Sequence, residues 1–236
     1  MGDRVHDTVT KISTYIRNEF DSDDYLIYGS FAEFKSGYIV EPQDIDIIVT
    51  GSTIQLPDNY SVLIDGIDIP LQINTMTKPE LFAEVERLEP KYLDVIYPSM
   101  CYSIYSVIED ILDKKTSHEI RSAISSISSK AFNKGKKKLI TNDDYDEYLG
   151  LKNIYHAFKF VHLAMRRLNP IPKVDMHFLK SKDIMEMYDI KCLIWNTYNA
   201  STGTLEERWK SLDSVIKPLY NKYMTEFRKQ FPKEIK

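Results

Sequence analysis

Apolar and polar positions follow two different periods in the first part of the chain. In residues 4–20 the apolar positions recur every three or four residues, which predicts an amphipathic helix. Residues 25–28 form a short β-prone run that stops at Gly29, and residues 44–47 alternate polar and apolar positions before the apolar residues 48 and 49. Both segments are predicted strands. Between them, residues 31–35 favour a brief helix.

The next segment, residues 61–76, has the pattern of a β-hairpin. Asp65-Gly66 is a two-residue turn signal, and the returning strand, residues 67–76, is polar on one face and apolar on the other. The hairpin is followed by Thr77-Lys-Pro-Glu80, a capping-box pattern in which the side chains at both ends hydrogen-bond to backbone N–H groups. The chain is therefore expected to leave the hairpin into a helix over residues 81–88.

The period changes again near residue 100 and divides the chain into two predicted domains. Residues 1–100 are expected to form an α+β domain, in which helices flank a small mixed β-sheet. Residues 101–236 show little strand signal and long helical periodicity, so an all-helical domain is expected there. One apolar stripe comprises Ile120, Ile124, Ile127 and Ala131, and further helices are predicted near residues 143–168, 181–198 and 204–230.

The formal net charge of −4 hides a strong asymmetry along the chain. Residues 1–113 hold 7 Lys and Arg against 21 Asp and Glu, a charge of −14. Residues 114–138 hold 8 basic residues against one acidic residue, a charge of +7, and residues 139–236 carry +3. An acidic part that binds a metal and a basic part that binds phosphate would suit phosphate-transfer chemistry. A solvated basic loop is the alternative explanation of the lysine run.

Other features of the composition exclude several classes of protein. No apolar run is long enough to span a bilayer, and the N-terminal residues lack the pattern of a signal peptide, so a cytoplasmic protein without membrane contact is expected. The two cysteines, Cys101 and Cys192, have no neighbouring Cys or His at zinc-ligand spacing. They are expected to be small buried or half-buried residues rather than a disulfide or a zinc site.

Candidate chemistry lies between the first two predicted strands. Gly29 and Ser30 would place backbone N–H groups and a hydroxyl beside an anion such as a triphosphate. Asp44 and Asp46 would point to one side of a strand whose isoleucines enter the core. At a spacing of about 6–7 Å and an effective dielectric of about 20, two carboxylates repel by about 2–3 kcal/mol, which a bound divalent cation would remove. The solvated face of an edge strand is the structural alternative.

Gly29-Ser30, thirteen residues, then Asp44-Ile-Asp46-Ile resembles the signature of the polymerase-β-type nucleotidyltransferase superfamily. The resemblance implies that Gly-Ser grips the triphosphate and that the Asp pair holds two Mg²⁺ ions, with Mn²⁺ as a substitute. It also implies a third carboxylate on a later strand, acting as metal ligand and general base. Asp68, between two isoleucines, is the preferred candidate. Asp65 is the alternative, although turn geometry alone explains an Asp before Gly.

A second resemblance covers the chain to about residue 170. Glu89-Pro-Lys-Tyr-Leu-Asp94 and the later Lys-x-x-Tyr-His pattern at Lys152 to His156 are similar to predicted nucleotidyltransferases of bacteria and bacteriophages. Helical spacing adds that Lys152, His156 and Lys159 share one face, where they could contact the base, ribose or phosphate of a nucleotide. A solvated helix face is the alternative.

Together these resemblances imply an enzyme that transfers a nucleoside monophosphate from a nucleoside triphosphate, with ATP favoured, to a hydroxyl acceptor and releases pyrophosphate. A protein hydroxyl, a small molecule and an RNA 3′ end are all compatible acceptors, and the sequence indicates no oligomeric state. One alternative is a catalytically silent protein of the same fold that acts as an antitoxin-like partner-binding module. A nuclease using the same acids is a weaker alternative, because the Gly-Ser turn would then have no role.

Overall fold

The chain folds into two compact units, Met1–Lys114 and Lys115–Lys236. The computed structural model describes residues 2–20, 24–35, 42, 44–51, 61–64, 67–95, 102–168 and 186–233. Within these ranges the protein is α+β, with one small mixed sheet and a majority of helical residues, as the hydrophobic pattern predicts. The boundary between the units follows Lys114, so the helix α4 (Tyr102–Asp113) groups with the first unit rather than with the helical unit.

The first unit contains a four-stranded sheet in the order β1-β2-β4-β3. β1 pairs antiparallel with β2, β2 pairs parallel with β4, and β4 pairs antiparallel with β3, which confirms the predicted mixed sheet and hairpin. The turn residues Asp65 and Gly66 lie outside the described residues. The strands are β1 (Tyr25–Tyr28), β2 (Ile45–Thr50), β3 (Ser61–Ile64) and β4 (Ile67–Met76).

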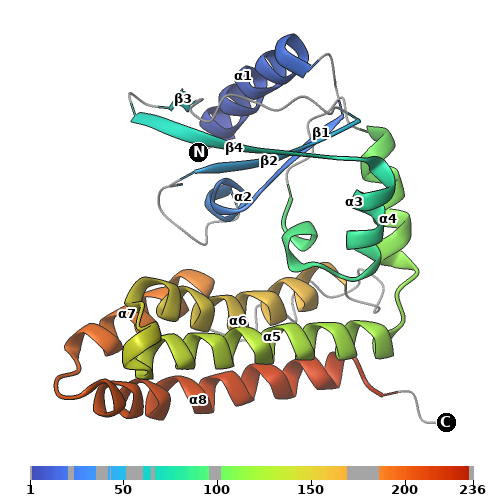
Figure 1. Ribbon diagram of the computed structural model, residues 1–236. Helices are drawn as coiled ribbons and strands as arrows, with labels where there is room; N and C mark the ends of the chain where they lie inside the picture. Colours follow the sequence, from blue (N-terminus) through green and yellow to red (C-terminus); the bar gives the residue numbers. More distant parts are fainter. Residues whose placement is uncertain are drawn as a thin grey trace. The chain divides into compact units, whose positions relative to one another are not determined.

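One face of this sheet is apolar and packs against helix α1 (Gly2–Phe20), which lies along it (Figure 1). Ile12 and Ile16 of α1 are fully buried against Ile45 and Ile47 of β2. Because side chains alternate along a strand, burying Ile45 and Ile47 turns the neighbouring Asp46 to the opposite face. The apolar core thus decides which side of the sheet carries the polar residues.

Short helices follow the strands of the first unit. The six-residue helix α2 (Ser30–Lys35) comes directly after β1, and α3 (Lys78–Glu86) follows β4. The predicted capping box of α3 is confirmed, with Thr77 and Glu80 each bonding to the backbone of the other. The 3₁₀ turn η1 (Pro90–Leu93) comes next, and α4 packs against α3. α4 lies in the part of the chain expected to be helical, and its apolar residues Ile104, Ile108 and Leu112 recur every four residues and are buried.

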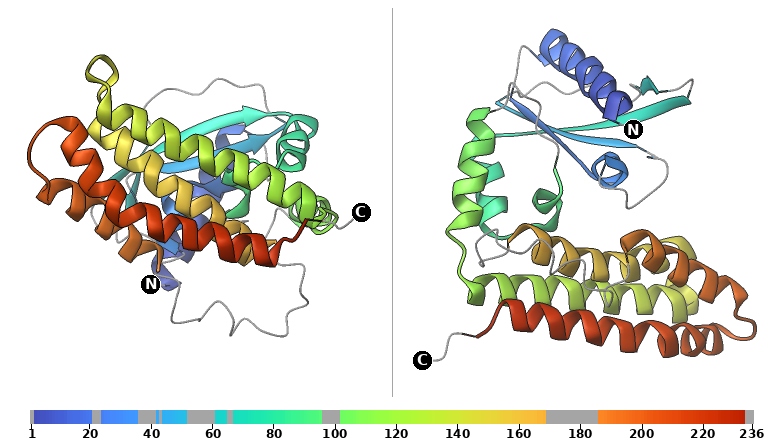
Figure 2. Two further views of the ribbon diagram at one scale, coloured as in Figure 1. Left: turned by 90° about the horizontal axis from the view of Figure 1, so that it is seen from below. Right: turned by 180° about the vertical axis from the view of Figure 1, so that it is seen from behind.

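The second unit is a bundle in which α5, α6 and α8 run side by side, and α7 packs against α6 and α8 (Figure 2). None of the described helices is long and apolar enough to cross a membrane. The elements are α5 (Ser117–Ile140), η2 (Asn142–Asp144), α6 (Glu147–Arg167), α7 (Met187–Ala200) and α8 (Leu205–Gln230).

The predicted helices of this unit are present, with shifted ends. The expected helix from residue 143 begins at Glu147, because the carboxylate of Asp146 accepts a hydrogen bond from the backbone N–H of Leu149 and caps the helix there. The predicted capping box at Thr204 is confirmed, and α8 continues through Pro218. The predicted start of α7 at residue 181 lies outside the described residues, which resume at 186.

Candidate functional site

Ser30 and Asp44 are joined by a close set of hydrogen bonds. The hydroxyl of Ser30 lies 2.7 Å from Asp44 Oδ1 and 2.5 Å from the backbone oxygen of Asp44, and it accepts a bond of 3.2 Å from the Asp44 backbone N–H. Asp44 directly precedes β2, whereas Ser30 is the first residue of α2. Ser30 therefore orients the Asp44 carboxylate, a role that the sequence analysis did not assign to it.

Gly29 and Asp46 are in equally close contact. Gly29 has a φ of +72°, and a Cβ added there would lie only 1.9 Å from Asp46 Oδ2. The antiparallel pairing of β1 with β2, in which Tyr28 stands opposite Asp46, produces this approach. Glycine is thus required at position 29 for its backbone conformation and for the space that the carboxylate occupies. The structure thus brings the predicted Gly-Ser turn and Asp pair together, with Ser30 against Asp44 and Gly29 against Asp46.

Asp68 does not stand opposite Asp46 in the pairing of β2 with β4. In the parallel pairing of β2 with β4, the residue opposite Asp46 is Gln72, and Gln72 Nε2 donates a 3.2 Å hydrogen bond to Asp44 Oδ2. Asp68 lies four residues earlier on β4, opposite Leu63, which places it about 13 Å along the strand from Gln72. Across the described part of the chain, no three His, Cys, Asp or Glu side chains could hold a metal together. Asp65 lies outside the described residues, so the third carboxylate of the cluster stays a prediction.

The polar face extends from the acid pair to Tyr28 and Asn74. Asn74 Nδ2 donates a 3.2 Å hydrogen bond to the hydroxyl of Tyr28, which points to the same side of the sheet as Asp46. Burial, and next the negative charge of Asp46, raise the pKa of Tyr28 to about 12. The phenol is therefore protonated at neutral pH and serves as a hydrogen-bonding group rather than as a base.

Beyond Tyr28 lies an ion pair anchored by α3. Glu84 accepts a 2.6 Å hydrogen bond from the hydroxyl of Tyr92 and pairs at 2.7 Å with Lys91 Nζ. The Lys91 ammonium also lies 5.9 Å from the centre of the Tyr28 ring and 5.1 Å from that of Tyr92. The segment Glu89 to Asp94 thus places a cation next to the tyrosine that borders Asp46. Lys91 is a functional candidate that the sequence analysis did not single out.

In the helical unit, the predicted stripe on α6 is present. Lys152 and His156 are half-buried and Lys159 is 8% exposed. Burial, and then the positive charges of Lys159, Lys152 and Lys191, lower the pKa of His156 to about 3. The imidazole is therefore neutral at physiological pH. Lys191, from α7, joins a cluster that the sequence analysis had assigned to α6 alone.

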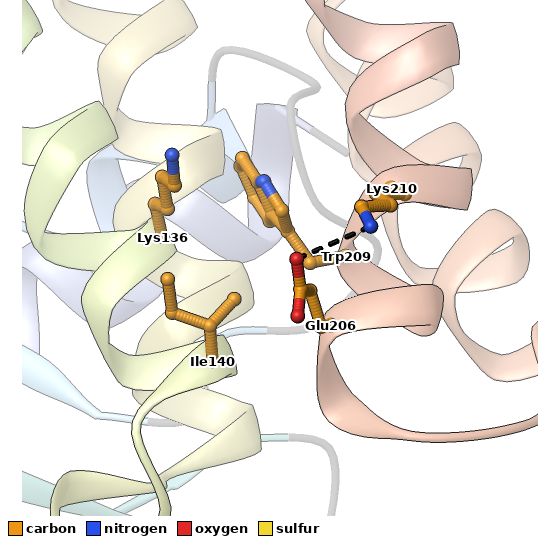
Figure 3. Close-up of a pocket in the computed structure, with 5 residues that line it drawn as sticks. All are labelled: Lys136, Ile140, Glu206, Trp209 and Lys210. Atoms are coloured by element: carbon orange, nitrogen blue, oxygen red, sulfur yellow. Dashed lines mark ion pairs between the residues drawn. The ribbon is translucent and has the colours of Figure 1, made fainter.

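A separate pocket of about 290 Å³ lies between α5 and α8 (Figure 3). The indole of Trp209 forms one wall, and Lys136 Nζ lies 5.8 Å from the centre of its ring. Glu206 and Lys210 form an ion pair of 3.2 Å at the pocket. None of the residues predicted to act on a nucleotide lines it.

The polar residues that the sequence analysis missed share one signal. Gln72 and Asn74 are exposed on either side of the half-buried Ile73 of β4, so they share a face with Asp68 in the sequence pattern itself. The alternation could have identified the face. Which residue of that face stands opposite Asp46 depends on the register between β2 and β4, and the alternation does not specify that register.

Comparison with protein-family models and with curated proteins found no match for this chain. The assignment of function therefore depends on the chemistry of the residues described above.

Proposed function

We propose that this protein is a nucleotidyltransferase that transfers a nucleoside monophosphate from a nucleoside triphosphate, with ATP favoured, to a hydroxyl acceptor. The observation that carries the proposal is the double contact in which Ser30 bonds to Asp44 while Gly29 lies against Asp46. The two carboxylates share one face of the sheet, and each is held against the Gly-Ser turn. A structural edge strand would not require glycine against a carboxylate.

The donor set fits one divalent cation. Mg²⁺ is commonly held by one or two protein carboxylates together with substrate phosphates, and Asp44 and Asp46 supply two carboxylates. The cation, Mg²⁺ or Mn²⁺, would neutralise charge on the phosphate oxygens. A second ion would need a further ligand, for which Asp68 remains the candidate that the resemblance implies.

The residues of this chain act mainly by position. Gly29 and Ser30 would orient the triphosphate, and Asn74 with the protonated Tyr28 would donate or accept hydrogen bonds beside it. The acceptor hydroxyl oxygen forms a bond to the α-phosphorus, the bond to the bridging oxygen breaks, and pyrophosphate leaves. The hydroxyl proton passes to a carboxylate of the pair or to water. Lys152, His156 and Lys159 are proposed contacts for a nucleotide on the helical unit.

The alternative function is a catalytically silent, antitoxin-like partner-binding protein of the same fold. The observation that favours it is that Gln72, and not a carboxylate, stands opposite Asp46. Mg²⁺-dependent release of pyrophosphate from ATP, CTP, GTP or UTP, measured in the presence of a cell extract, separates the two functions. A silent protein would add nothing to the release by the extract alone.

Replacing either acid should abolish transfer. Asp44→Asn and Asp46→Asn each keep the side-chain shape but lose the charge that holds the cation, so the rate of pyrophosphate release should fall on the order of 100-fold or more. Asp68→Asn, on the same sheet, tests the third carboxylate and should retain activity if Asp44 and Asp46 alone hold the cation. Full activity in both Asp44→Asn and Asp46→Asn would overturn the site, and an inactive Asp68→Asn would restore the three-carboxylate cluster.

A further inference from the structure

The face on which α6 meets α7 gathers basic side chains from both helices. Lys191 Nζ of α7 lies 5.9 Å from the centre of the Tyr155 ring, and Tyr155 immediately precedes His156 on α6. Lys152 and Lys159 stand one turn before His156 and nearly one turn after it. We call this face the α6–α7 surface and define it by Tyr148, Lys152, His156, Lys159, Lys191 and Trp195.

Aromatic rings alternate with the cations on this surface. Lys152 Nζ lies 5.6 Å from the centre of the Tyr148 ring, and Lys191 Nζ lies 5.8 Å from that of Trp195. The side chain of Tyr148 is 49% exposed. The imidazole of His156 is neutral and packs 5.5 Å from the Phe160 ring. Aromatic rings thus lie between ammonium groups, so a nucleic-acid base could stack on a ring while its phosphate contacts a lysine.

The positive charge around His156 favours the binding of an anion. The charged groups that act on its ring are three ammonium groups from two helices, and the ring itself resists a further positive charge. The side chain of Lys159 is largely removed from solvent. The whole unit, residues 115–236, holds 23 Lys and Arg against 14 Asp and Glu, a formal charge of +9. A polyanion would relieve the mutual repulsion of these groups.

The surface is longer than a single nucleotide needs. From Tyr148 to Lys159 the helix rises about 16 Å, and rings and cations recur over that whole length. A positively charged track with aromatic side chains along it is the arrangement that binds single strands without strict sequence preference. A free triphosphate would engage the lysines near His156 but would leave Tyr148 at the far end without a base.

We propose that the α6–α7 surface binds single-stranded nucleic acid. Lys152 and Lys191, which are both half-buried, contact its phosphates, and Tyr148 and Trp195 stack on its bases. That this strand is the acceptor whose terminal hydroxyl receives the nucleotide rests on the proposed function. Binding to the surface itself does not, because it requires neither Asp44 nor Asp46.

The test uses the full chain and fluorescein-labelled ten-residue oligouridine and oligothymidine, with binding followed by anisotropy in EDTA over a range of salt. The wild type should bind at low salt and weaken as salt rises. Lys191→Ala should bind several-fold more weakly, and its salt slope should be shallower by about 0.7, the value for one lost phosphate contact on a single strand. Lys217→Ala is the matched control, because its ammonium lies 4.6 Å from the Phe132 ring centre but outside the surface.

Tryptophan fluorescence adds a positional readout, since the chain has only two tryptophans. In Trp209→Phe the remaining Trp195 should be quenched by either oligonucleotide, whereas Trp195→Phe should show little change because Trp209 is 5% exposed.

Three results would overturn the proposal: no binding of either strand by the wild type, equal binding by Lys191→Ala and Lys217→Ala, or displacement of the strand by equimolar ATP. The third would identify a mononucleotide site instead. Preference between the two oligonucleotides distinguishes RNA from DNA as the source of the strand. Binding without any pyrophosphate release would support the surface and count against the proposed enzyme, so the two failures are distinguishable.

Discussion

At the scale of single residues, the candidate site depends on the close contact between Gly29 and the carboxylate of Asp46. Gly29 adopts a left-handed backbone conformation, and the volume that a side chain would fill is taken by Asp46. Gly51 also has a positive φ, +82°, but an added Cβ there would meet nothing within 4 Å. A substitution at Gly51 therefore measures the free-energy cost of the left-handed backbone alone. A substitution at Gly29 adds the cost of the clash with Asp46.

Replacing both glycines in turn should show that difference. Gly51→Ala should lower the free energy of unfolding by about 1–2 kcal/mol, the cost of a left-handed conformation for an L residue. Gly29→Ala should cost more and should also abolish pyrophosphate release, because the new methyl group displaces Asp46. Urea denaturation and the transfer assay measure the two effects. Equal stability loss with activity retained in both variants would contradict the contact.

At the scale of elements, α5 and α6 approach closely because glycines face each other. A Cβ at Gly135 would lie 2.7 Å from the backbone oxygen of Gly150, and a Cβ at Gly150 would lie 2.6 Å from Leu139 Cδ2. This approach fixes the position of α6, and with it the α6–α7 surface. The neighbouring Ser128 adds a 2.7 Å hydrogen bond from its hydroxyl to the backbone oxygen of Ala157.

Gly135→Ala tests this packing through the sign of its effect. In an open helix, replacing Gly by Ala stabilises by about 0.5–1 kcal/mol. Here the methyl group meets a backbone oxygen that cannot rotate away, so overpacking should destabilise the protein by about 1–3 kcal/mol in urea denaturation. Asn133→Ala, at an exposed position on the same helix, is the control and should change stability little. A more stable Gly135→Ala would show that the helices are not in contact there.

At the scale of the whole molecule, both units use the same device to start helices. Backbone N–H groups of Thr77, Thr116 and Thr204 donate hydrogen bonds to Glu80, Glu119 and Glu207, and these bonds lower the pKa of each carboxyl below its ordinary value of 4.5. A lowered folded-state pKa means that the unfolded chain binds protons more readily. The contribution to stability is therefore complete above pH 4.5 and is lost as the pH falls through the folded-state values.

Replacing all three glutamates with glutamine should remove that part of the acid dependence. Glutamine keeps the capping hydrogen bond but does not titrate, so the stability of the triple variant should fall less steeply than the wild type below pH 4.5. Glu206→Gln, which removes a carboxylate outside the capping boxes, is the control. Thermal unfolding midpoints between neutral and acidic pH provide the measurement, and identical acid profiles would contradict the assignment.

Much of the site could be predicted from the sequence because its signals are local. The glycine at the end of a strand, the alternation of Asp44 and Asp46 with isoleucines, and the helical spacing of Lys152, His156 and Lys159 each depend on neighbours in the chain. The capping boxes at Thr77 and Thr204 were predictable for the same reason.

The sequence by itself determined the α+β class, the faces of the strands and helices, and the residues that these faces carry. Only the tertiary structure decided which residues meet across elements. The parallel register of β2 with β4 places Gln72, and not Asp68, opposite Asp46, and the packing of α7 on α6 adds Lys191 to the basic cluster. Alternation specifies a face, but a shift of two residues along a strand preserves that face, so the chemical partner is set by the packing of the core.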